Sequence, residues 1–485
     1  MLVVKCNKEQ FAYDIHSLVK AFYPAEDVKV FVEGEKSLSS DVQLPEFFVL
    51  FEDKKIIFEI YEAGQVLSRG VSEVDEVLER SEYKNLLKHL LYKQLSKYTG
   101  KELPWGNLTG IRPTKIPYQM IENGENKDAC VNYMKKIYLC SERKADLAYD
   151  IASREHDILS KLHEDVGYSL YIGIPFCPTT CLYCSFTSYP IAMCRGKVDA
   201  YLSAMEKEID YVAEAFKDKT LDSIYIGGGT PTTLEAEELD RLLTYVEKKI
   251  DLSTALEYTV EAGRPDSITR EKLEVIKRHG VTRISVNPQT FKEETLKLIG
   301  RRHTVSQVKE TFAMARKVGF DNINMDLILG LPNETEDDVI ETLRQVKELG
   351  PDSLTVHSLA IKRASKMSQW IIENGIQCLN NTDGAMESTM KAADEMNMKP
   401  YYLYRQKNMS GNFENVGYAT DGKYGIYNIL IMEEIQSIVA IGAGTVSKNV
   451  YGDGRIERCD TVKDVDLYIE KIDEMIDRKR KLYEV

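Results

Sequence analysis

The sequence predicts an α/β protein: a partial (β/α)6 barrel preceded by an N-terminal α+β domain and followed by a small C-terminal extension. Its 485 residues exceed what one compact core usually holds. From Tyr168 onward, short apolar runs alternate with amphipathic helical stretches, and the residues before Tyr168 lack this alternation. We therefore expect domains at residues 1–165, 166–362 and 363–485.

The N-terminal part has the pattern of a separate α+β domain. The runs Phe47–Phe51 and Ile56–Ile60 are typical of strands, and charged helical stretches follow them. One segment, residues 104–115, is rich in turn residues. It fits a folded connector with a buried Trp105, or a site where Arg112 and Lys115 bind an acidic group.

The barrel is predicted from six strand-like runs with helices between them. Strands alternating with helices form βαβ units, which give a parallel sheet with right-handed crossovers. Six units favour a partial barrel over a complete eightfold one, and chemistry in such barrels collects at the carboxyl ends of the strands. The predicted strands are Leu170–Ile174, Ile224–Ile226, Tyr258–Glu261, Arg283–Val286, Ile323–Leu329 and Ser353–Val356, and the clearest helices are Val198–Phe216, Glu235–Lys249, Arg270–His279 and Val305–Val318.

Three cysteines follow the first predicted strand in the spacing C-x3-C-x2-C: Cys177, Cys181 and Cys184. A [4Fe-4S] cluster normally takes four cysteine ligands. Three cysteines leave one iron open to a ligand, in the way that separates catalytic from structural zinc sites. The alternatives are three buried apolar cysteines or a zinc site that lacks a ligand. The other six cysteines have no metal-ligand spacing.

The other predicted strands also end in residues suited to a site. The glycine-rich turn Gly227–Pro231 follows the second strand and lets backbone approach a ligand, although such a turn also has purely structural uses. Single residues follow the third to sixth strands, and a carboxylate there could instead cap the next helix. These residues are Glu261, Gln289, Asp326 and Ala360.

Composition indicates which kinds of binding partner and which cellular compartment to expect. A net charge of −14 disfavours unspecific binding to nucleic acid. The sequence shows no leader pattern and no apolar run of membrane length, and its cysteine count of nine is odd. We expect a cytoplasmic, reduced protein that binds neither nucleic acid nor membrane and is a monomer.

The cysteine triplet, the glycine turn and the six strand–helix units together resemble the radical S-adenosylmethionine (SAM) superfamily. More narrowly, four segments resemble oxygen-independent coproporphyrinogen III oxidase, also called dehydrogenase. With its N-terminal extension, the chain is most similar to the HemZ-type subgroup. The four segments are Tyr171–Cys177, Gly227–Pro231, Val286–Phe291 and Asp326–Pro332.

This resemblance implies cofactors and the residues that hold them. The three cysteines would bind a [4Fe-4S] cluster whose open iron is chelated by SAM, and the family implies no further catalytic side chain. The first SAM would contact Tyr171, Gly228, Glu261 and Ala360. A second SAM would contact Tyr183, Gly229, Thr230, Gln289, Arg301 and Asp326.

The resemblance also implies the reaction. The cluster and SAM would generate a 5'-deoxyadenosyl radical, and two propionates of coproporphyrinogen III would become vinyl groups, giving protoporphyrinogen IX in haem biosynthesis. A low-potential donor such as flavodoxin or ferredoxin would supply electrons, and residues 363–485 would cover the substrate. Its carboxylates need cationic partners. The candidates by position are Arg301, Arg302, Arg363 and Arg405.

One departure from the family pattern weakens the oxidase assignment. The best-known members carry a further cysteine two residues after the triplet, where this chain has Phe186 after Ser185. A haem chaperone of the same family is an alternative, but its H-N-x-x-Y-W segment falls at Glu414–Ala419, without the histidine and the tryptophan. A two-SAM methyltransferase or haem-cleaving enzyme also stays open.

Three C-terminal patterns complete the sequence interpretation. The aromatic and basic run Tyr401–Met409 fits a strand with one packed face or a surface for a tetrapyrrole. The run Ile441–Ser447 predicts a tight turn, either near SAM or purely structural. Residues 461–481 predict a charged helical tail.

Overall fold

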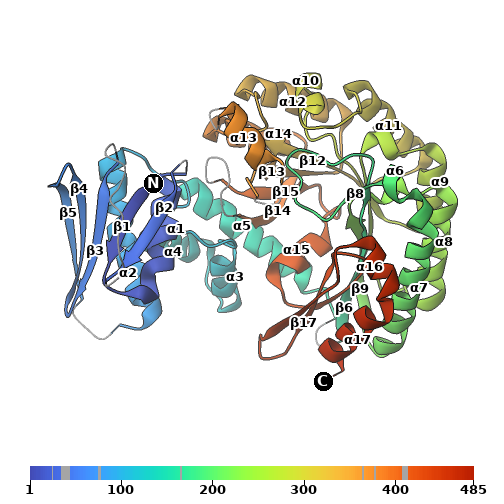
Figure 1. The fold of residues 1–485 in the computed structure, drawn as a ribbon, viewed down its shortest axis with the longest axis horizontal. Helices are drawn as coiled ribbons and strands as arrows, with labels where there is room; N and C mark the ends of the chain where they lie inside the picture. Colours follow the sequence, from blue (N-terminus) through green and yellow to red (C-terminus); the bar gives the residue numbers. More distant parts are fainter. Residues whose placement is uncertain are drawn as a thin grey trace. The chain divides into compact units, whose positions relative to one another are not determined.

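The computed structural model describes residues 1–24, 26–33, 44–74, 78–163, 166–362, 365–375, 378–406 and 413–484 (Figure 1). The chain forms two compact units. The first holds residues 1–153 and 403–414, and the second holds residues 154–402 and 415–485. The three-domain division inferred from the sequence stays a prediction.

The first unit is a five-stranded sheet with helices, as an α+β domain requires. Strand β1 runs parallel to β2 and β3, whereas β3, β4 and β5 pair antiparallel, in the order β2-β1-β3-β4-β5. Alternate side chains of β3 join the apolar core that α1 and α2 also line. The elements are β1 (Leu2–Cys6), α1 (Ala12–Phe22), β2 (Val28–Val32), β3 (Glu46–Glu52), β4 (Lys55–Glu62), β5 (Gln65–Glu73), α2 (Arg80–Thr99), α3 (Lys115–Glu122), α4 (Lys127–Tyr138) and α5 (Glu142–Leu159), which continues into the second unit.

All six predicted barrel strands are confirmed in the second unit. They lie side by side in chain order and run parallel, with Leu170 opposite Ile224 and Asn324 opposite Ser353. Their residues are buried almost throughout, as expected where a parallel sheet is covered on both faces. The strands are β6 (Gly167–Ile174), β9 (Thr220–Gly228), β10 (Glu257–Gly263), β11 (Arg283–Val286), β12 (Ile323–Leu329) and β13 (Ser353–Ser358).

Helices cover the outer face of this curved sheet (Figure 1). Three of them begin at capping boxes, which satisfy backbone N–H groups at the helix start. The helices between strands are α6 (Ile191–Cys194), α7 (Val198–Ala215), α8 (Ala236–Lys249), α9 (Arg270–Arg278), α10 (Glu293–Leu298), α11 (Val305–Val318) and α12 (Glu336–Leu349). None of the described helices is long and apolar enough to span a bilayer.

The C-terminal residues widen the sheet at both edges, which the sequence did not predict. Strand β16 pairs parallel with β6, and β17 and β18 follow it antiparallel, while β15 pairs antiparallel with β13. The remaining elements are β7 (Phe176–Cys177), β8 (Tyr189–Pro190), α13 (Met367–Asn374), α14 (Asp383–Glu395), β14 (Lys399–Tyr404), β15 (Asn415–Ala419), α15 (Ile426–Glu433), β16 (Ser437–Ile441), β17 (Val446–Val450), β18 (Ile456–Asp460), α16 (Val465–Glu470) and α17 (Ile472–Tyr483).

Each C-terminal sequence pattern corresponds to a turn, helix or strand in the structure. The predicted tight turn joins β16 to β17, and Gly442 there has a positive φ of 100°. A Cβ on Gly442 would stand 2.3 Å from the Gly173 carbonyl oxygen, so the turn needs glycine to pack on β6. The predicted charged tail forms α16 and α17. Residues 401–404 lie in β14, and residues 407–409 of that run fall outside the described residues.

Candidate functional site

The cysteine loop follows β6 at the carboxyl edge of the parallel strands. Cys177 and Cys181 are buried, and Cys184 is partly exposed. The Thr230 hydroxyl lies 3.4 Å from the Cys177 sulfur, and Arg264 Nη1 donates to the Cys181 sulfur at 3.9 Å. The Leu182 N–H donates to the Ile299 carbonyl at 3.0 Å and fixes the far side of the loop. Residues that follow β9 and β10 therefore contact two of the thiols, and the residue that follows α10 anchors the loop.

The three thiols influence one another electrostatically. The pKa of the Cys177 thiol is raised to about 11, chiefly by burial and also by Cys184 and Cys181, while Thr230 and Arg264 lower it. Burial also raises the pKa of Cys184, with Cys181 adding and Arg301 opposing. Metal ions offset the free-energy cost of deprotonating these thiols, because they bind thiolates and their positive charge compensates the negative sulfur.

The donor set suits a cluster better than a single ion. Over the described parts of the chain, no group of three or more His, Cys, Asp or Glu side chains is arranged to hold one metal ion. A four-iron cluster bonds each cysteine at a different iron, so its thiols share a space without meeting at one point. Arg264 and Arg301 beside the thiols add positive charge where thiolate sulfurs carry negative charge.

The glycine turn packs directly on the cysteine loop. The Gly229 and Thr230 N–H groups each donate at 2.7 Å, to the carbonyls of Ile174 and Phe176. A Cβ on Gly229 would stand 2.5 Å from the Phe176 oxygen, and Gly228 has a φ of 105°. The close approach thus serves the protein backbone here, and the Gly229 N–H is already used.

Glu261 lies near the carboxyl end of β10, beside a stack of tyrosine rings. The Tyr225 hydroxyl donates to the Glu261 carboxylate, and the rings of Tyr171, Tyr225 and Tyr427 stack with interplanar angles of 12–23°. Burial raises the pKa of Glu261 to about 7, and the nearby Asp326 adds to the shift. The sequence did not predict Tyr225 or Tyr427 as site residues. Tyr427 belongs to α15, and no sequence pattern indicates that this helix packs beside Tyr171.

A second polar group forms after the end of β11 and beside the middle of β12. The Gln289 N–H donates to the Asp326 carbonyl at 3.0 Å, and Gln289 takes a left-handed φ of 69°. Arg301 donates from one nitrogen to the Asn287 carbonyl and from the other to the Tyr183 hydroxyl at 3.2 Å. The structure thus joins Gln289 with Asp326 and Arg301 with Tyr183. Ala360 lies half-buried just beyond β13.

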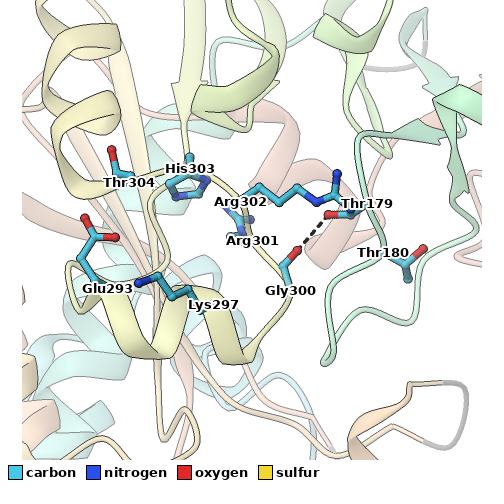
Figure 2. Close-up of a pocket in the computed structure, with 9 residues that line it drawn as sticks. All are labelled: Thr179, Thr180, Glu293, Lys297, Gly300, Arg301, Arg302, His303 and Thr304. Carbon is cyan, nitrogen blue, oxygen red and sulfur yellow. Dashed lines mark hydrogen bonds between the residues drawn. The ribbon is translucent and has the colours of Figure 1, made fainter.

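The other arginine candidates lie in different surroundings. Arg302 is exposed and lines a cavity of about 470 Å³ beside the cysteine loop, where the Thr179 hydroxyl donates to Gly300 (Figure 2). Arg405 is buried in the first unit, donates to the Leu108 carbonyl and lies 5.9 Å from the Trp105 ring. Arg363 falls outside the described residues. The cavity is lined by Thr179, Thr180, Glu293, Lys297, Gly300, Arg301, Arg302, His303 and Thr304.

The turn-rich segment of the first unit encloses the buried tryptophan that one interpretation predicted. Trp105 is fully buried, and its ring N–H donates to Glu414 at 2.7 Å. Lys144, also fully buried, pairs with the same carboxylate. These contacts tie Glu414 into the first unit.

Comparison with known proteins decides the family. A model described as the radical SAM superfamily matches residues 171–346. The oxygen-independent coproporphyrinogen-III oxidase-like protein HemZ of Bacillus subtilis is 40% identical over 87% of this chain and 87% of its own length. This chain is a radical SAM protein of the HemZ type. Its cofactors are therefore the [4Fe-4S] cluster and SAM of that superfamily.

Two further proteins are similar to part of this radical SAM protein. The haem chaperone HemW of Bacillus subtilis is 38% identical over 40% of this chain and 51% of its own length. The structure of Escherichia coli coproporphyrinogen III oxidase, HemN, matches with a TM-score of 0.52 at 22% identity, covering 66% of this chain and 72% of that one. This likeness confirms the predicted partial-barrel fold.

Proposed function

We propose that this protein is a radical SAM oxidoreductase of the coproporphyrinogen dehydrogenase type. It converts two propionates of coproporphyrinogen III to vinyl groups in the cytoplasm, as a monomer, with electrons from a flavodoxin or ferredoxin. The relative it resembles over most of its length is named oxidase-like. Each propionate loses a hydrogen atom, carbon dioxide and one electron.

The observation that carries this proposal is the presence of two polar groups beside one cysteine loop. Cys177, Cys181 and Cys184 would hold the cluster. Glu261 with Tyr171 forms one group, to which we assign the first SAM together with Gly228 and Ala360. Arg301 with Tyr183 and Gln289 with Asp326 form the other, to which we assign a second SAM together with Gly229 and Thr230.

The chemistry divides between cofactor and chain. When bound, the cluster and SAM supply the oxidant that removes a hydrogen atom from an unactivated carbon. Glu261 offers negative charge to the cationic SAM, and Arg301 offers a guanidinium already oriented by the Asn287 carbonyl. The buried setting of these groups strengthens both interactions and excludes water.

Glu414 argues against the haem chaperone alternative. It occupies the position at which the chaperone segment has its histidine, and its carboxylate is fully buried. Trp105 and Lys144 both donate to it. A carboxylate held by two donors in a packed core is not a ligand for an exchangeable haem.

An anaerobic turnover assay tests the proposal. The reconstituted protein receives reductant, SAM and coproporphyrinogen III, and products are followed by mass. Loss of two carboxyl groups with matching 5'-deoxyadenosine is the expected result. Haem retention without SAM turnover would favour the chaperone, and S-adenosylhomocysteine would show methyl transfer; either result would refute the proposal.

A further inference from the structure

Lys362 is a half-buried cation to which no acidic side chain of the described residues is paired. It lies four residues beyond the end of β13. A charge that is partly removed from water and left unpaired costs free energy. Binding sites often hold such charges, because a ligand of opposite charge supplies the missing interaction.

The neighbours of Lys362 place it beside the cysteine loop. Its ammonium lies 5.9 Å from the centre of the Phe186 ring, two residues after Cys184. Burial lowers the pKa of Lys362, and the Cys184 thiol opposes this effect. Burial lowers the pKa of His357, Asp326 opposes this effect, and Lys362 adds a smaller lowering. Lys362 is therefore near Cys184 of the cysteine loop and near His357 of β13.

The Phe186 side chain is unusually exposed for an aromatic residue beside the cysteine loop. Its relative exposure is 70%, although it lies two residues after the partly buried Cys184. A large exposed ring beside a binding site offers its face to a flat apolar group of a ligand. Phe186 also stands where the family's further cysteine was expected.

The backbone under Lys362 is fixed. Its carbonyl accepts hydrogen bonds from the Ser365 N–H at 3.0 Å and from the Ser365 hydroxyl at 2.7 Å. The neighbouring Leu359 and Met367 belong to an apolar cluster that Leu182 and Tyr183 of the cysteine loop also contact. The backbone from which the Lys362 side chain reaches the Phe186 ring is thus fixed by hydrogen bonds and by its apolar neighbours.

We propose that Phe186 and Lys362 form a subsite for a pyrrole ring that carries a carboxylate side chain. The ring packs on the face of Phe186, and the carboxylate pairs with the Lys362 ammonium. This inference rests on the proposed function, since it assigns a substrate contact to the same site. It also gives the substrate a cation in the site that is not already hydrogen-bonded to a backbone carbonyl, unlike Arg301.

Equilibrium binding of coproporphyrin III tests the subsite without turnover. This oxidised, fluorescent analogue keeps all four propionates, and its tetramethyl ester lacks the negative charges. In the reconstituted protein, Lys362→Met should weaken binding of coproporphyrin III about tenfold to a hundredfold, and Lys362→Arg should recover most of it. The ester should bind the wild type and Lys362→Met alike. Phe186→Leu should weaken both probes.

A matched control and the contrary outcomes sharpen this test. Lys366→Met removes an exposed ammonium four residues away and should bind coproporphyrin III like the wild type. Unchanged binding by Lys362→Met would overturn the inference. So would weakened SAM binding with intact coproporphyrin binding, which would assign Lys362 to the SAM carboxylate. A wild type that binds no coproporphyrin III at all would instead refute the proposed function.

Discussion

At the scale of single residues, Glu261 lowers folding stability at a position where we propose that it binds SAM. Burial is the largest cause of its raised pKa, near 7, and Asp326 adds to it, while the Tyr225 hydrogen bond and the Arg283 guanidinium oppose it. An unfolded chain would release the Glu261 proton near pH 4.5. Between these two values the folded protein retains a proton that the unfolded chain has lost, so Glu261 lowers stability as the pH rises through this window.

Replacing Glu261 should therefore stabilise the protein that lacks SAM. Glu261→Gln should gain up to about 3 kcal/mol at pH 8, little at pH 5 and nothing below pH 4. Its affinity for SAM should fall, because the neutral amide no longer attracts a cation. Denaturant unfolding at the three pH values measures the first effect, with the exposed Glu470→Gln as control. Equal stability of Glu261→Gln and wild type at pH 8 would contradict this account.

The residues themselves were predictable to different degrees. In the structure Glu261 lies within β10, Asp326 within β12, and Gln289 shortly after β11. They could be found because the carboxyl ends of parallel strands meet at one edge of the sheet, and each residue lies in or near such a predicted strand. Lys362 and Phe186 could not, since their contact joins two loops that share no sequence pattern. Tyr427 was also missed, because only tertiary packing brings α15 beneath Tyr171.

At the scale of elements, the glycine turn and the cysteine loop behave as one piece. Gly229→Ala would place a methyl group 2.5 Å from the Phe176 carbonyl oxygen, one residue before Cys177. Overpacking of this kind typically costs about 1–3 kcal/mol. We expect Gly229→Ala to lose stability and to bind less iron after reconstitution.

Gly196→Ala is the matched control for this prediction, because a Cβ there meets nothing within 4 Å. Unfolding midpoint and iron per chain are measured for both variants. If Gly229→Ala took up iron and unfolded as Gly196→Ala does, the turn would not support the cysteine loop as described.

The strands and helices of the barrel were predictable because their periodicity is local. The added strands were not. Strand β16 has the composition of any short core segment, and its place beside β6 depends on pairing Ser437–Ile441 with Tyr168–Ile172, far away in the sequence. Register between such distant segments is set by packing that no local pattern records.

At the scale of the whole chain, the C-terminal helix α17 packs against α7 and stabilises the barrel. Lys479 of α17 pairs with Glu208 of α7, and both side chains are fully buried. The same carboxylate accepts the Gly442 N–H at 2.8 Å, at the turn that packs on Gly173. The last residues of the chain therefore help to hold β6, from which the cysteine loop emerges.

The central claim, that the three cysteines hold a cluster which cleaves SAM, has a direct test in Cys181→Ala. The measurement is anaerobic formation of 5'-deoxyadenosine after reconstitution and reduction, alongside Cys378→Ala, which removes a cysteine outside the triplet. We predict that Cys181→Ala forms none, because a buried ligand of the cluster is gone, and that Cys378→Ala matches the wild type. Formation of 5'-deoxyadenosine by Cys181→Ala at the wild-type rate would contradict the assignment.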